Sequence, residues 1–268
     1  MVVIFAVIAA IAAANVFILL SSTVEEKNYY GNLLRPITGA VAVVLALIVV
    51  YRQKVDGLFG RAYAGLAAGL VLYFIAEIIW GYYSIGAGIE VPFPSAADAF
   101  WLAGYVPLGY HLFRVSRLYG VGLRKRNTIL VGAAVAIFSA AYIYNIIAVS
   151  ELSSPDSMTK LAVSIAYPVF DAILIMPAIL SILKSGKGKL TAVPWIFISW
   201  IFTCIADGLF GYTVVTNIAG DLSIWNLFYN AAYLFMAAGL YWHNKFFILD
   251  KHKLAELNIM QSGGKRHK

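Results

Sequence analysis

GLAAGLVLYFIAEIIWGYY, residues 65–83, decides the fold class. Its length suits a membrane-crossing helix, because about 20 apolar residues span roughly 30 Å of hydrocarbon. The stretch nevertheless carries one acid, Glu77, after small residues that permit close helix packing. A charge within hydrocarbon costs about 2.5–3.5 kcal/mol, so Glu77 is expected to face other helices or a wet cavity.

The rest of the chain has the same character. Of its 268 residues, 62% are hydrophobic and 12% are charged, about half the charged share of a soluble domain. We therefore expect an all-α integral membrane protein, multi-pass in the cell membrane, with a single transmembrane domain over residues 1–250. The first helix lacks the basic residues that open a signal peptide, which favours a retained helix. The eight expected transmembrane helices cover residues 2–20, 34–51, 62–83, 97–118, 128–149, 161–183, 192–215 and 222–244.

Basic residues gather in every second connection between these helices. Arg52, Lys54 and Arg61 follow the second helix, and further Lys and Arg residues follow the fourth, the sixth and the eighth. The other connections are neutral or acidic. Basic connections stay in the cytoplasm, so both termini and the basic tail, 251–268, are expected there. Topology thus accounts for the net charge of +7, and we expect no nucleic-acid partner.

Two pairs of segments indicate an internal repeat. IAEIIWGYY (75–83) and IADGLFGYT (205–213) share four of nine residues, and DAFWLAGY (98–105) and NLFYNAAY (226–233) share three of eight. The pairs occur in the same order at nearly the same separation. We therefore expect two parallel four-helix repeats, about 2–118 and 128–246, related by a pseudo-two-fold axis along the membrane normal. Glu77 then corresponds to Asp207.

Polar residues of the expected helices collect toward the outer side of the membrane. Glu77 lies about 9 Å below the outer end of its helix, Arg35 opens the second helix, and Asp98 suits the positive start of the fourth. These positions favour an outward-facing, acidic, aromatic-lined cavity between the repeats. The alternative is that Glu77 and Asp207 only hold helices together. The candidate ligand-binding residues are Glu77, Asp207, Asp171, Arg35, Trp80, Trp101, Tyr105, Asn230, Tyr212 and Tyr233; Tyr82, Phe210 and Tyr229 are further expected wall residues.

Several chemistries are disfavoured by the sequence. It has no HExxH, no phosphate-binding GxxxxGKS and no GxSxG elbow. The one cysteine, Cys204, excludes an intrachain disulfide. His111 stands alone, which favours a hydrogen-bonded interfacial residue over a metal ligand. We therefore expect no metal and no cofactor.

Part of the chain resembles a bacterial sensory module. The stretches are VPFPSAADAFWLAGYVPLGYHLFR (91–114), AYPVFD (166–171) and ADGLFGY with WNLFYNAAYLF (206–212 and 225–235). They are similar to the multi-helix membrane sensory regions that precede diguanylate cyclase and histidine kinase domains, and the likeness covers most of the chain from about residue 60. It implies sensing of a ligand, although this chain carries no output domain.

A second resemblance is to the lysoplasmalogenase-like family of eight-helix membrane proteins, which has an intramembrane acid in each half. Glu77 and Asp207 match those acids in placement, although Glu77 stands where that family has aspartate. The likeness implies that one acid protonates a vinyl ether and the other activates water, so Glu77 and Asp207 would be catalytic.

The sequence therefore leaves four functions open. The first is a ligand-binding or sensory membrane module that takes a small molecule or lipid between the repeats. The second is an intramembrane hydrolase. The third is a proton-coupled carrier, and the fourth is an accessory subunit of a membrane complex. The expected partners are membrane lipid, the ligand, and a second copy of the chain or another membrane subunit.

Overall fold

The fold was analysed in a computed structural model that describes residues 2–21, 23–118, 125–150, 155–185, 193–216 and 224–249. These residues are almost entirely helical and include no β-strand. Two π-helical turns, Tyr82–Gly86 and His243–Leu249, continue the third and eighth helices. The α-helices are α1 (Val2–Ser21), α2 (Val24–Gln53), α3 (Gly57–Gly81), α4 (Ala96–Leu118), α5 (Lys125–Val149), α6 (Pro155–Ser185), α7 (Val193–Thr216) and α8 (Ile224–Trp242).

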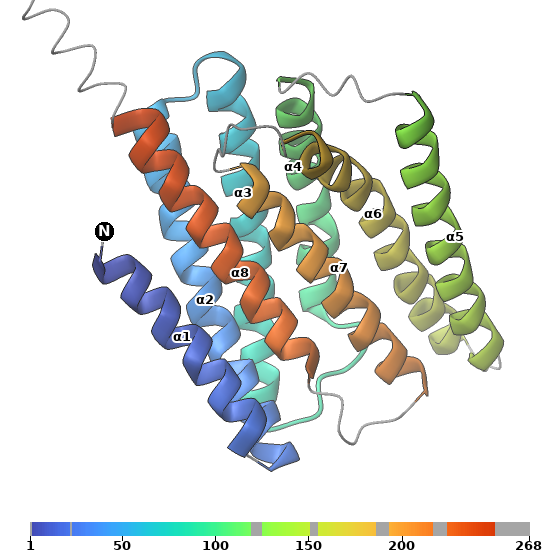
Figure 1. Ribbon diagram of the computed structural model, residues 1–268. Coiled ribbons are helices and arrows are strands. Elements are labelled where there is room, and N and C mark those ends of the chain that lie inside the picture. Colours follow the sequence, from blue (N-terminus) through green and yellow to red (C-terminus); the bar gives the residue numbers. More distant parts are fainter. Residues whose placement is uncertain are drawn as a thin grey trace, which may run out of the picture.

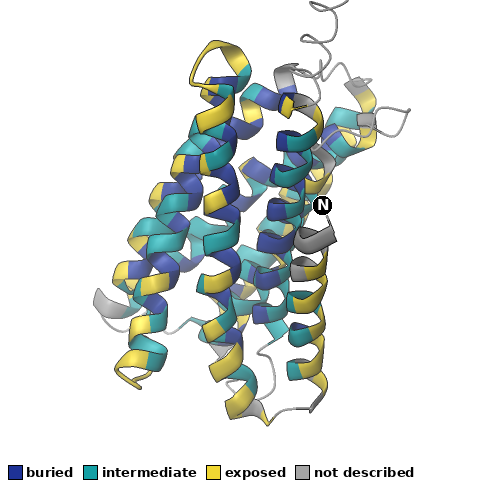
Figure 2. Cartoon of the chain, turned by 90° about the vertical axis from the view of Figure 1, so that its left-hand side faces the viewer, coloured by how far each residue is buried: buried dark blue, intermediate teal, exposed yellow. Residues whose placement is uncertain are grey.

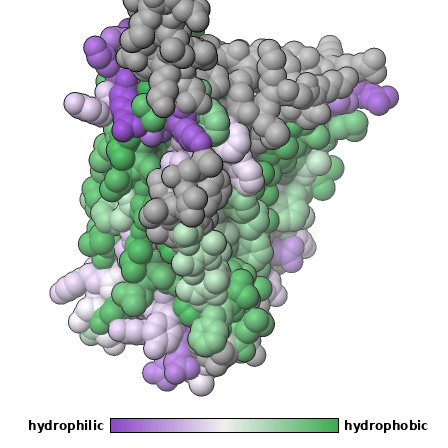
Figure 3. Space-filling model, turned by 60° about the vertical axis from the view of Figure 1, so that its left-hand side comes forward, coloured by the Kyte–Doolittle hydropathy of each residue, from purple (hydrophilic) through white to green (hydrophobic). Residues whose placement is uncertain are grey.

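Each of the eight predicted segments coincides with one of these helices, which run up and down in one bundle (Figure 1). Five of them are long and apolar enough to cross a membrane: α2, α3 with its π-helical turn, α5, α6 and α7. The surface seen in Figure 3 is hydrophobic across its middle, with hydrophilic residues toward both ends. The fold is therefore all-helical, with several helices suited to a membrane.

Two further helices, α4 and α8, carry several buried polar side chains and lie among the others. Helix α4 packs against α3 and α6, while α8 packs against α7, α2 and α1. Buried polar side chains on these two helices include Asp98, His111, Asn226 and Asn230. Their apolar stretches are interrupted because their inner faces contact protein rather than lipid.

Helix α2 begins ten residues before its predicted start at residue 34. Thr23 and Glu26 form a capping box, in which the Thr23 side chain accepts from the Glu26 backbone and the Glu26 carboxylate accepts from the Thr23 backbone. This pairing satisfies two backbone donors at the helix start. Arg35 therefore does not open the helix, as the sequence suggested, but lies about three turns inside it.

Close packing of α3 on α4 sets the position of the residues between them. A Cβ atom on Gly69 would lie 2.3 Å from Leu108 Cγ and 3.2 Å from the Gly104 carbonyl, and one on Gly104 would lie 2.6 Å from the Tyr73 ring. Only glycine permits this approach of the two backbones. It brings Tyr105, the residue after Gly104, into the centre of the bundle.

Burial is uneven across the bundle. The buried residues lie on the inner faces of α2, α3, α4, α6, α7 and α8, and exposed residues face outward (Figure 2). Helix α5 stands at the edge, where it packs against α6 and α7. Ile146 is the one α5 side chain that is buried among those described.

Candidate functional site

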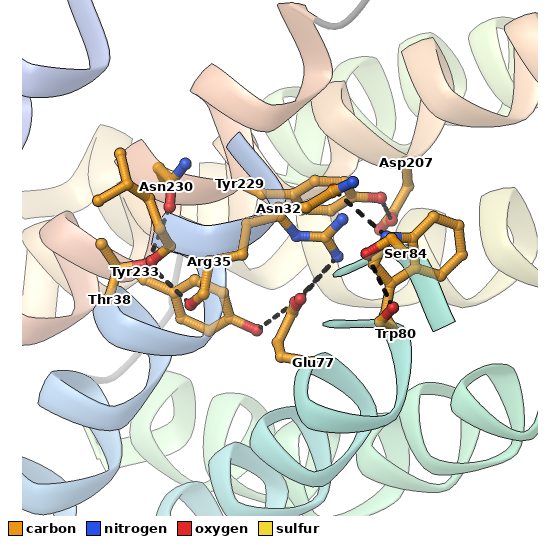
Figure 4. A network of polar contacts seen from close by, with 11 residues as sticks. Asn32, Arg35, Thr38, Glu77, Trp80, Ser84, Asp207, Tyr229, Asn230 and Tyr233 are labelled. Atoms are coloured by element: carbon orange, nitrogen blue, oxygen red, sulfur yellow. Dashed lines mark hydrogen bonds and ion pairs between the residues drawn. The ribbon is translucent and has the colours of Figure 1, made fainter. Parts of the chain in front are cut away.

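An ion pair lies at the centre of the first polar cluster (Figure 4). Arg35 Nη2 donates to Glu77 Oε1 at 3.0 Å and lies 2.9 Å from Oε2. The Tyr233 hydroxyl donates to Glu77 Oε1 at 2.9 Å, which joins α8 to α2 and α3. Arg35 and Glu77 are each 2% exposed. We call Arg35, Glu77 and Tyr233 the ion-pair cluster; its acid is neutralised within the protein.

Aromatic rings surround the Arg35 guanidinium. Its central carbon lies 4.5 Å from the Tyr229 ring centre, 5.5 Å from that of Trp101 and 5.6 Å from that of Trp80. Cations are attracted to the faces of such rings, most strongly when they are removed from water. The rings and Glu77 together hold the guanidinium in place.

A second cluster contains two acids and two tyrosines. The Tyr105 hydroxyl lies 2.7 Å from Asp171 Oδ1 and 3.2 Å from Asp207 Oδ2, and Tyr229 donates to Asp207 Oδ1. Asp171 is 8% exposed, whereas Asp207 is partly exposed. We call Asp171, Asp207, Tyr105 and Tyr229 the aspartate cluster. It contains no basic side chain.

Proline interrupts the helices beside both clusters. Pro36 follows Arg35 in α2, Pro107 lies two residues after Tyr105 in α4, and Pro168 precedes Asp171 by three residues in α6. A proline inside a helix removes one backbone hydrogen bond and leaves a carbonyl one turn earlier without its usual donor. Irregular backbone of this kind is tolerated within a membrane where it is enclosed by protein or lines a cavity.

A cavity with a volume of about 740 Å³ lies between the helices, and its wall contains the ion-pair cluster and three members of the aspartate cluster, Asp171, Asp207 and Tyr229. Leu70 and Trp80 of α3 both line it, so it extends for about 15 Å along that helix, at 1.5 Å per residue. Its walls come from every helix from α2 to α8 and are mostly apolar. The Arg, Glu and Asp side chains that line it in the described part of the chain are Arg35, Glu77, Asp171 and Asp207.

Most of the candidate residues meet at this cavity. Two do not line it: Tyr105 lies behind Asp171 and Asp207, and Asn230 is fully buried, where it accepts from Thr38 at 2.9 Å. Tyr82, which the sequence placed in the wall, is 66% exposed and lies outside it. The candidates that line the cavity are Arg35, Glu77, Trp80, Trp101, Asp171, Asp207, Tyr212 and Tyr233.

The aromatic wall residues that were not singled out from the sequence include three tyrosines and a tryptophan, Tyr73, Tyr142, Tyr167 and Trp200. Two of their hydroxyls are already bonded to protein, Tyr142 to the Gly208 carbonyl at 2.9 Å and Tyr167 to Asp98 at 2.8 Å. Aromatic residues are frequent throughout the chain, so only the three-dimensional arrangement distinguishes these four. Tyr167 precedes Pro168 in the AYPVFD segment, which was the one available signal.

The expectations for His111 and Asp98 can be compared with the hydrogen bonds that these residues form. His111 Nδ1 lies 2.9 Å from the Ala62 carbonyl, as expected for an interfacial histidine. The described residues contain no group of three or more metal-ligating side chains. Asp98 accepts from the Ser95 backbone at 2.6 Å and stabilises the start of α4.

Comparisons with models of known protein families, with curated proteins and with solved structures found no match to this chain. Arguments about function therefore rest on the cavity and its two clusters.

Proposed function

We propose that this chain is a multi-pass protein of the cell membrane that binds a small molecule or lipid in the cavity and acts as a ligand-binding or sensory module. The observation that carries the proposal is the cavity itself. Its volume of about 740 Å³ lies within the range of about 300–1,000 Å³ that is usual for ligand sites. A mostly apolar wall with a few converging polar groups is typical of such sites.

We further infer that all eight helices cross the membrane, that both termini lie in the cytoplasm, and that the chain consists of two parallel repeats. Two hydrogen bonds support the repeat. Tyr233 of the second half donates to Glu77 of the first, and Tyr105 of the first half contacts Asp207 of the second. The sequence repeat exchanges Tyr105 with Tyr233 and Glu77 with Asp207, so it exchanges these two contacts.

The pairing of helices supports the same inference. A two-fold relation between the halves exchanges α2 with α6, α3 with α7, and α4 with α8. The packing of α2 on α8 then corresponds to that of α6 on α4. The packing of α3 on α4 corresponds to that of α7 on α8, and all four pairs are in contact. The cavity then lies at the interface between the repeats, where such folds hold their ligands.

Native mass spectrometry tests the proposal. The protein is purified from membranes in a mild detergent as wild type, Asp171→Asn, Asp207→Asn and Asp56→Asn. Asp56 is exposed and makes no side-chain cap, so its variant controls for the loss of an acid. The proposal expects a bound mass in wild type and Asp56→Asn that is lost from the other two. A bare protein of equal stability in all four forms contradicts it.

A lysoplasmalogenase-like hydrolase is a second candidate, because one hydroxyl, that of Tyr105, contacts both Asp171 and Asp207. Two carboxyls near one point suit acid–base chemistry, in which one gives a proton and the other takes one from water. Asp171 and Asp207 would then be the two catalytic acids. Glu77, which the sequence suggested as the partner of Asp207, is instead bound by Arg35.

A vinyl-ether lysolipid distinguishes the two candidates. Its hydrolysis adds one water and releases a fatty aldehyde, which is measured directly. Release by wild type that is lost in Asp171→Asn and Asp207→Asn favours the hydrolase. Binding of the lipid without aldehyde release favours the sensory module.

A further inference from the structure

The charges on the cavity wall do not balance. Of the four Arg, Glu and Asp residues that line it, Arg35 is basic, and Glu77, Asp171 and Asp207 are acidic. Arg35 forms its ion pair with Glu77. Neither aspartate forms an ion pair with a basic side chain among the described residues, although carboxylates removed from water need a counter-charge or a proton.

The aspartate cluster also has fewer hydrogen-bond donors than its carboxylate oxygens can accept from. A tyrosine hydroxyl carries one proton, so Tyr105 cannot donate to Asp171 and Asp207 at the same time, although it contacts both. The hydrogen bonds of Asp171 within the described protein involve Oδ1 and its backbone carbonyl, and none involves Oδ2. Asp171 is nevertheless 8% exposed and lines the cavity. Asp171 Oδ2 is therefore an acceptor that receives no hydrogen bond from the described residues.

The neighbouring wall supplies few donors for these acids. The hydroxyls of Tyr142 and Tyr167 are directed to Gly208 and Asp98. These two residues therefore add ring surface beside the aspartates rather than hydroxyl donors. Rings attract a cation and repel an anion at their faces. The remaining wall toward Leu70, Ile179 and Met236 is apolar.

We propose that the occupant of the cavity is an amphiphilic amine, whose protonated amino group donates to Asp171 and Asp207 and whose apolar body fills the space toward Leu70, Ile179 and Met236. This proposal rests on the proposed ligand-binding function and specifies its ligand class. An anion would meet two unpaired acids, since Arg35 is already neutralised by Glu77. A neutral lipid would leave both acids without a counter-charge. The amine can be a free molecule or the ethanolamine headgroup of a lysolipid.

Quenching of tryptophan fluorescence by brominated chains tests this proposal. Trp80, Trp101 and Trp200 line the cavity, and bromine quenches indole emission on contact. The probes are 11-bromoundecylamine, 11-bromoundecanol and 11-bromoundecanoic acid, which differ in charge but not in chain. A lysophosphatidylethanolamine with a brominated acyl chain tests the headgroup source. Each is titrated in dodecyl maltoside micelles.

The variants are Asp171→Asn, Asp207→Asn and the exposed control Asp56→Asn. Asp171→Asn keeps an oxygen for Tyr105 and removes the charge. We expect wild type and the control to bind the amine at least tenfold tighter than the alcohol, since a charge-assisted hydrogen bond contributes about that much or more. In Asp171→Asn and Asp207→Asn, the amine should fall to the affinity of the alcohol, with alcohol binding unchanged. Unchanged alcohol binding also shows that the variants remain folded.

Other outcomes separate the amine proposal from the function on which it rests. Equal, saturable binding of amine and alcohol in every form overturns the amine proposal and leaves a ligand-binding cavity. Tighter binding of the carboxylic acid also overturns it and assigns the cavity to anions. Absence of saturable quenching by every probe contradicts ligand binding as well. Tighter binding of the lysolipid than of the free amine, with the same dependence on Asp171, supports the proposal and identifies the headgroup as the source.

Discussion

Glu77 and Asp207 correspond to each other in the proposed repeat but have different surroundings. Glu77 is 2% exposed and bound by Arg35 and Tyr233. Asp207 is partly exposed and is bound by two phenols, with Asp171 beyond one of them. The charged residue that α2 contributes to its cluster is thus a base, Arg35, whereas the one that α6 contributes is an acid, Asp171. Both acids line the cavity, but Glu77 forms an ion pair there, whereas Asp207 and its neighbour Asp171 form none.

The comparison separates structure from function. A neutral, enclosed ion pair connects α2, α3 and α8 and needs no ligand. Two unpaired acids beside a space of about 740 Å³ add little to the packing of α6 on α7, and they supply a place for a ligand. The following predictions test this division of roles, and the stabilities are measured as free energies of unfolding by SDS titration of mixed micelles.

The largest effect is expected from Arg35→Ala, which leaves Glu77 buried without its cation. Breaking a buried pair in this way costs about 3–5 kcal/mol. The matched double variant, Arg35→Leu with Glu77→Leu, should lose much less, because no charge is left alone. A loss below about 1 kcal/mol for Arg35→Ala, the level of an exposed pair, would contradict the structural role of the ion-pair cluster.

Removal of the corresponding phenols should have an intermediate effect. Polar contacts between membrane helices contribute about 0.6 kcal/mol on average and up to about 1.7 kcal/mol. Tyr105→Phe removes contacts to two acids and Tyr233→Phe a contact to one. In ligand-free protein, Tyr105→Phe should therefore be the more destabilising of the two. The reverse order would show that Tyr105 is not shared by the two aspartates.

The smallest effect is expected from Asp207→Asn. This change weakens two hydrogen bonds but also removes one of two like charges, so the net change should lie within about 0.5 kcal/mol of zero. Glu77→Gln, its counterpart, should cost several times more, because Arg35 is then left unpaired. Equal losses in the two variants would mean that Asp207 also balances a cation, and the comparison would fail.

The helices were predictable from the sequence because long apolar runs separated by short basic or polar connections leave few alternatives. Their ends were less predictable. Helix α2 extends back to Val24 through the capping box of Thr23 and Glu26, a local signal outside the apolar run. For the same reason Arg35 was placed at the end of a helix rather than inside one.

The candidate site was predictable in its residues but not in its pairing. Charged residues in apolar helices are few, so Arg35, Glu77, Asp171 and Asp207 were identifiable. The sequence suggested Glu77 and Asp207 as partners, whereas the residues joined through one hydroxyl are Asp171 and Asp207. Which groups pair depends on helix rotation and on the close approach of α3 and α4, and neither follows from apolar periodicity alone.

The central claim, that the cavity holds a ligand, is tested most directly by filling it. A Cβ atom added to Gly208 or to Gly81 meets no atom within 4 Å, but Gly208 lines the cavity and Gly81 does not. Native mass spectra of wild type, Gly208→Phe and Gly81→Phe, purified alike, should show a bound mass in wild type and Gly81→Phe that is absent from Gly208→Phe. A bound mass that persists in Gly208→Phe, or its absence from all three proteins, would contradict the account.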